Sequence, residues 1–203
     1  MPGYDLPYDI DDLIVDHLDD KSIILLSFFK PELRHRFILG ETYDFTKIPK
    51  KFYCMISKVV VHNWDQLRQV EYFFNWIRVI EFGNDYVQPI PTPFRNIIPQ
   101  GRMSFGNRFN QPINNLPPNL QIITIGNSFN KHIVSLPFNL KRLELGNRFN
   151  QPINNLPQTV EIIKIGNSFN QPVDSLPSSL VQLELGNNFN QPDRDWETNY
   201  QFL

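Results

Sequence analysis

Apolar and polar residues alternate in short runs in the second half of the chain, and these runs recur every 20 residues. The four clearest runs are 122–125, 142–145, 162–165 and 182–185. Alternation with a period of two over so few residues predicts short β-strands with one buried face. Prolines recur between the runs and remove backbone donors, so the connecting segments are predicted to be extended or turn-like rather than helical.

The residues around the runs keep the same period without a gap. The recurring rings are Phe109, Phe129, Phe149, Phe169 and Phe189, and the recurring glycines are Gly106, Gly126, Gly146, Gly166 and Gly186. A unit of this length cannot bury its own apolar face, so successive units must stack and share a core. The sequence therefore predicts a repeat solenoid of parallel strands. Its inward columns hold the rings and, beside them, Ile125, Leu145, Ile165 and Leu185.

Glycine and asparagine recur at fixed positions in each unit, which favours a structural role for both. We expect the glycines to permit a bend or a positive φ where each strand ends. Asparagines follow at two positions, represented by Asn107 and Asn110 in the first regular unit. We expect them to form ladders that satisfy backbone groups of the turns from coil to coil, because a sheltered unpaired group is costly.

The strand positions between the inward ones are predicted to line an exposed surface. The first such column is Arg102, Ile122, Arg142, Ile162 and Gln182, and the second is Ser104, Thr124, Glu144, Lys164 and Glu184. These positions vary from unit to unit whereas the framework does not, which is typical of a recognition surface for a protein target. Ile122 and Ile162 are either an apolar patch for that target or exposed apolar residues of the ordinary kind.

The string FNQPI, at 109 and 149, and its variant FNQPV at 169 resemble the FNIP repeat family, which is leucine-rich-repeat-like. The string departs to FNKHI at 129 and breaks after the proline of the last unit. The resemblance covers about residues 101–192 and implies a leucine-rich-repeat-like solenoid that binds proteins. Before it, residues 46–100 are expected to form degenerate or irregular first coils, and after it residues 193–203 a cap or tail.

Less regular copies of the repeat occur before residue 101, with strand-like runs at 37–39, 59–61 and 79–82. Between them, residues 66–76 favour a helix. The runs at 37–39 and 59–61 would extend the array toward the N-terminus.

Residues 1–45 show apolar positions at helical spacing and predict a small α-helical segment. This segment resembles an F-box, with departures at Pro31 and in the missing tryptophan after Lys30. The matching positions are Leu6, Pro7, Ile10, Leu13, Ile14 and Leu18. The resemblance implies that this face binds a Skp1-type adaptor protein, as in substrate adaptors of cullin ubiquitin ligases. FNIP proteins with similar starts occur in amoebae and giant viruses. Alternatively, the helices only cap the first coil, which every solenoid needs.

The composition limits the classes of partner that the protein can attract by charge and indicates its cellular compartment. The chain has 19 basic and 21 acidic residues, and a formal net charge of -2 creates no long-range field for nucleic acid or an anionic membrane. A single cysteine, Cys54, excludes an intrachain disulfide framework and fits a reducing compartment. No apolar run approaches the roughly 20 residues that span a bilayer. We expect a cytoplasmic protein, in the host cell cytoplasm if the source is viral.

No catalytic pattern stands out. The four histidines lack metal-ligand spacing, and the acidic residues between 9 and 20 fit the solvated face of a helix. No phosphate-binding glycine loop occurs, because the glycines of the array follow the repeat. We expect no enzyme, no metal and no cofactor. Two hypotheses follow: an F-box-type substrate adaptor, or a ligase-independent scaffold or decoy.

Overall fold

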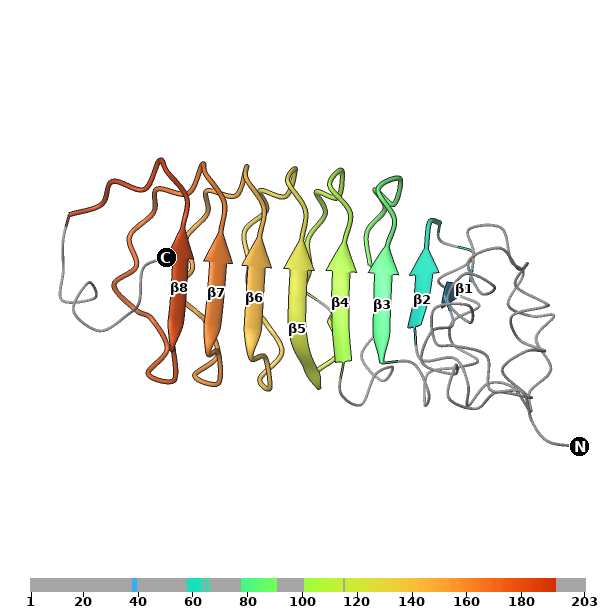
Figure 1. Cartoon of the computed structure of the whole chain (residues 1–203), viewed down its shortest axis with the longest axis horizontal. Helices are drawn as coiled ribbons and strands as arrows, with labels where there is room; N and C mark the ends of the chain where they lie inside the picture. Colours follow the sequence, from blue (N-terminus) through green and yellow to red (C-terminus); the bar gives the residue numbers. More distant parts are fainter. Residues whose placement is uncertain are drawn as a thin grey trace, which may run out of the picture.

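A computed structural model describes residues 38–39, 58–63, 65, 78–90, 101–114 and 116–192. These residues form a single eight-stranded sheet in which the strand order follows the chain order (Figure 1). The strands are β1 (Ile38–Leu39), β2 (Lys58–Val61), β3 (Val79–Phe82), β4 (Gly101–Phe105), β5 (Leu120–Ile125), β6 (Arg142–Leu145), β7 (Ile162–Ile165) and β8 (Gln182–Leu185). All neighbours pair in parallel, so each strand and the return segment after it make one coil.

The strands pair in the register of the repeat. Ile122 lies beside Arg142, and Thr124 beside Glu144. The ladder is irregular at one point, where the register between β4 and β5 shifts at Gly101. β6, β7 and β8 coincide with the predicted runs, and β5 begins two residues earlier than its run. A parallel β-solenoid with extended returns is therefore confirmed for this part of the chain.

The core consists of side-chain columns that run along the array. Four rings, Phe109, Phe129, Phe149 and Phe169, are 0% exposed. Consecutive rings stack with centroids 5.8 to 6.4 Å apart, and the last pair, Phe169 and Phe189, are 6.0 Å apart. The predicted inward column of rings is confirmed. In the last coil Leu185 and Phe189 are only partly buried.

The less regular copies also belong to the array. β2 and β3 pair in parallel, and β1 lies within residues 1–45 and pairs with β2. In the coil that begins with β3, Tyr86 takes the ring position, and its hydroxyl donates to the carbonyl oxygen of Pro89 at 3.3 Å. Burial raises the pKa of Tyr86 to about 12. The predicted N-terminal helices, the helix at 66–76 and the C-terminal cap or tail lie outside the described residues.

The role predicted for the glycines was wrong in part. None of the glycines at 83, 106, 126, 146, 166 and 186 has a positive φ in the left-handed region. A Cβ on Gly146 would lie 2.5 Å from the carbonyl carbon of Gly126, which is too short for two carbon atoms. Glycine is needed because the backbones of neighbouring coils approach closely where the strands end.

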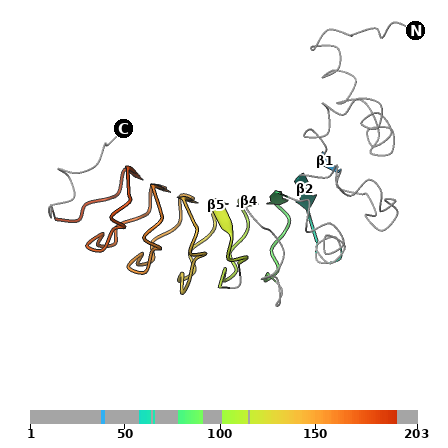
Figure 2. The ribbon, with the colours of Figure 1, turned by 90° about the horizontal axis from the view of Figure 1, so that it is seen from below.

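The predicted asparagine ladders are confirmed. The backbone N–H of Asn127 donates to Oδ1 of Asn107 at 3.2 Å, and Asn147 repeats this bond to Asn127. A second ladder runs through Asn110, Asn130, Asn150, Asn170 and Asn190, with bonds of 2.9 to 3.0 Å. Figure 2 shows the sheet on the inner side of a shallow arc, with the return segments on its outer side.

Candidate functional site

The two predicted columns lie on the accessible side of the sheet, which we call the strand face. Its ten residues are Arg102, Ser104, Ile122, Thr124, Arg142, Glu144, Ile162, Lys164, Gln182 and Glu184. Arg102 is exposed and the other nine are partly exposed, whereas the strand residues between them point into the core. The alternation of the strands therefore gives the outward placement that the sequence predicted, including for Ile122 and Ile162.

Ion pairs neutralise most of the charge on the strand face. Nε of Arg142 donates to Glu144 at 2.7 Å, and Nζ of Lys164 lies 2.5 Å from Oε1 of Glu184. Thr124 adds a hydroxyl donor 3.1 Å from Glu144. Partial burial raises the pKa of Glu144, but the hydrogen bonds from Arg142 and Thr124 and the charges of Arg142 and Lys164 outweigh it and hold that pKa below 4.5. Glu144 is thus a carboxylate at neutral pH.

A groove crosses the strand face where β5 to β8 end. Its volume is about 540 Å³, and the glycines of four coils form part of its lining. The side chains from the second column that line it are Thr124, Glu144, Lys164 and Glu184. Because glycine has no side chain, the surface is hollowed along the whole row. The structure brings these four predicted residues together, while the first column lies outside the groove.

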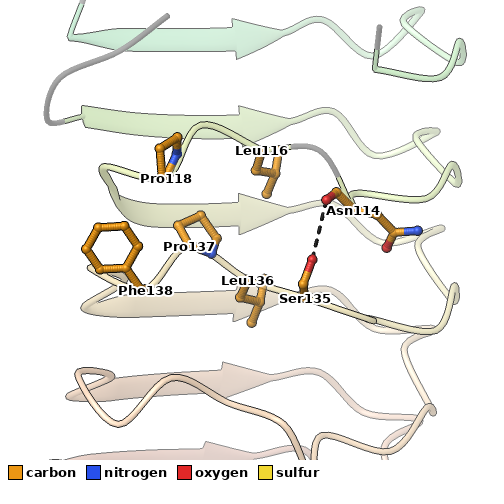
Figure 3. Close-up of a pocket in the computed structure, with 7 residues that line it drawn as sticks. All are labelled: Asn114, Leu116, Pro118, Ser135, Leu136, Pro137 and Phe138. Carbon is orange, nitrogen blue, oxygen red and sulfur yellow. Dashed lines mark hydrogen bonds between the residues drawn. The ribbon is translucent and has the colours of Figure 1, made fainter. Parts of the chain in front are cut away.

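The opposite side of the array has a pocket that the sequence reasoning missed. We call it the return-side pocket, and its volume is about 400 Å³ (Figure 3). It is lined by Asn114, Leu116, Pro118, Ser135, Leu136, Pro137 and Phe138. Phe138 is 63% exposed at its edge. The sequence contains a signal for this pocket, because Phe138 stands at a repeat position where the other coils have Pro118, Gln158 and Ser178.

The part of the chain that the structure describes has no cluster of three or more histidine, cysteine, aspartate or glutamate residues that could hold a metal ion. Within the same residues, no helix has the length and apolar character needed to cross a membrane. The six F-box-like positions, Leu6, Pro7, Ile10, Leu13, Ile14 and Leu18, lie outside the described ranges.

Comparison with known proteins supports the assignment of the repeat. Residues 109–148, 129–168 and 169–194 match the family model of the FNIP repeat. The coils between residues 109 and 194 are thus similar to FNIP repeats. We refer to residues 101–192 as the FNIP array. A leucine-rich-repeat-like FNIP array is a suitable framework for a protein-interaction module, because it offers an extended surface on a rigid core.

The fold is also similar to a solved structure. The crystal structure of CroV588, described as a novel circular LRR protein, matches with a TM-score of 0.56 and 25% sequence identity. The match covers 81% of this chain but 30% of that protein, so the present chain spans less than a third of its length. No curated protein sequence matches the chain significantly. The leucine-rich-repeat-like character of the solenoid rests on this structural similarity together with the FNIP repeats.

Proposed function

We propose that this protein is a non-enzymatic, cytoplasmic substrate adaptor. In this proposal the strand face binds a target protein, and the N-terminal segment binds a Skp1-type protein of a cullin ubiquitin ligase. One observation carries the proposal: the buried framework of the FNIP array stays constant, while the ten residues of the strand face change from coil to coil. A surface that varies over a constant core favours recognition of another macromolecule.

The shape of the strand face also favours a protein target. Five strands from β4 to β8 at about 4.8 Å spacing give roughly 19 Å of surface, which suits another protein better than a small molecule. Ile122 and Ile162 supply apolar contact two coils apart. The paired charges around them can orient a bound partner without creating a strong net electric field.

Target binding can be tested by affinity capture followed by mass spectrometry. We expect that Ile122→Asp with Ile162→Asp removes the specific targets, because a carboxylate would lose solvation in an apolar contact. Thermal unfolding should show that this variant remains folded, since both side chains point outward. An unchanged set of captured proteins would contradict binding on the strand face.

The link to a ligase rests on the F-box-like spacing of residues 6–18. We expect the full chain to co-purify with a Skp1-type protein, and Ile14→Asp to abolish that complex while target capture persists. If no such complex forms at micromolar concentrations, the adaptor role is wrong.

The alternative is a ligase-independent scaffold or decoy, in which the N-terminal segment only caps the solenoid. It predicts that the chain without residues 1–34 captures the same targets and that the full chain binds no Skp1-type protein. The two functions therefore differ in one binding measurement.

A further inference from the structure

One return segment departs from the repeat at four exposed positions. Lys131 replaces the usual Gln, and His132 replaces the usual Pro. Val134 replaces the usual Asn or Asp, and Phe138 stands where Pro118, Gln158 and Ser178 stand in other coils. All four side chains are exposed, Val134 by 58% and Phe138 by 63%. The other coils keep the same buried core without these residues, and the turn at 154–155 and 174–175 is absent at 134–135, so core packing does not explain the four side chains.

One of the four departures, Phe138, lines an apolar recess, and the other three precede it on the same return segment. Phe138 stands at one end of the return-side pocket, and Asn114 and Ser135 stand at the other (Figure 3). Ser135 donates its hydroxyl to the carbonyl oxygen of Asn114 at 3.4 Å, which satisfies the polar end internally. Leu116 and Leu136 line the middle. A volume of about 400 Å³ accommodates one large apolar side chain and part of the chain that carries it.

Charge is distributed unevenly along the FNIP array. Residues 101–150 contain six basic residues and one acidic residue, whereas 151–192 contain one basic and three acidic residues. The return-side pocket lies in the basic part, and the exposed Lys131 is on the same return segment as Phe138. Three of the six basic residues are ion-paired, Arg108 with Asp85, Lys141 with Glu161 and Arg142 with Glu144. The exposed Lys131 therefore supplies the positive charge on the pocket side and favours a ligand with negative charge there.

We propose that the return-side pocket docks an acidic peptide segment of a partner protein, which inserts one large apolar side chain beside Phe138. The site lies on the opposite side of the coils from the strand face, so it does not depend on the function proposed above. A nucleic acid that stacks a base on Phe138 is the rival occupant, and the experiment separates the two.

The experiment selects a display library of random 12-residue peptides on the full chain. The test variant carries Val134→Asn and Phe138→Ser, which restore the residues that Asn154 and Ser178 provide in other coils. The matched control is Val181→Gln, because Val181 is 69% exposed elsewhere and the equivalent residue is Gln121. Wild type and control should enrich acidic peptides with one large apolar residue.

Fluorescence anisotropy then measures one enriched peptide against each variant. We expect the double variant to weaken binding at least tenfold, as for an anchor residue in an interface, and the control to change it less than twofold. Lys131→Gln should weaken binding about threefold at low salt, with a smaller effect at high salt. Thermal unfolding should show that all three variants remain folded.

Three results would overturn the proposal. The first is that peptides are enriched no more on wild type than on the double variant, and the second is that the enriched peptides lack acidic residues. The third is that a single-stranded oligonucleotide binds more tightly than the peptide and that its binding depends on Phe138. Loss of the peptide on changing Ile122 and Ile162 would assign it to the strand face instead. If target capture fails in those strand-face variants while the peptide still binds, the two sites are separate.

Discussion

The strand side and the return side of each coil are held together by different chemical groups. On the strand side, parallel backbone ladders join β1 through β8. On the return side, backbone bonds between coils continue next to the strand ends, as from the N–H of Ser128 to the carbonyl oxygen of Asn107 at 2.9 Å. Side chains make further connections: the hydroxyl of Thr159 donates to the carbonyl oxygens of Phe138 and Leu140 at 2.8 and 2.9 Å. Ser179 makes the equivalent bonds one coil later. Where the backbone supplies the hydrogen bonds, the outward residue can change freely.

Because of this difference, a sequence change on the strand face and one on the return side indicate different things. A change on the strand face is compatible with any coil, so it is the natural place for recognition to diversify. A departure on the return side replaces a residue that the other coils use for turns or ladders. Such a departure is therefore the more informative signal, as at Phe138, and the comparison can be tested by substitutions of decreasing expected effect.

The largest effect is expected for the ring column that both sides share. Phe149→Ala should lower the free energy of unfolding by about 3 to 5 kcal/mol, because the ring is 0% exposed and stacks on both neighbours. Urea unfolding followed by circular dichroism measures the loss. Ile122→Ala, on the strand face, should cost much less, and equal losses would contradict the assignment of inside and outside.

The next effect concerns the boundary between strand and return. Gly146→Ala should destabilise the protein by about 1 to 3 kcal/mol, because its Cβ would overlap the backbone of the preceding coil. At Gly83 a Cβ would meet the imidazole of His62, which can move, so Gly83→Ala is the milder comparison. Melting temperatures of the two variants provide the test. A neutral Gly146→Ala would refute the requirement for close approach.

The ladders of the return side should give a smaller loss. Oδ1 of Asn150 accepts bonds from the N–H of Asn170 at 2.9 Å and from the amide of Gln171 at 3.1 Å. Asn150→Ala should therefore cost about 1 to 2 kcal/mol. In the more exposed ladder, Asn147 accepts only one such bond, at 3.4 Å, and Asn147→Ala should cost less. Chemical denaturation ranks them, and the reverse order would be inconsistent with these bonds.

The smallest effect is expected on the strand face and depends on pH. Because the folded pKa of Glu144 lies below its ordinary 4.5, its carboxylate stabilises the fold above that pH and loses this effect as the pH falls through the folded pKa. Glu144→Gln should cost about 0.5 kcal/mol at pH 7 and almost nothing at strongly acidic pH. Unfolding at several pH values checks this, and a difference that grows toward acid would contradict it.

The sequence predicted the features that the period repeats and missed those that depend on close contact between coils. Strands, rings and asparagine ladders follow from strict recurrence, because equivalent residues of stacked units must meet. The glycines were assigned the wrong reason, since the distance between Gly126 and Gly146 is a property of the packed coils. The return-side pocket was missed because the prediction relied on residues that recur in every unit, and Phe138 does not recur.

The asparagine ladders of the FNIP array join each coil to its immediate neighbour, as in the ladder of Asn130, Asn150 and Asn170. Excising residues 127–166 would join Gly126 to Asn167 and restore the same local sequence at the seam. The molecule would become shorter by two strand spacings, roughly 10 Å, with each remaining kind of contact intact. Length is thus adjustable in whole coils, independently of what the coils bind.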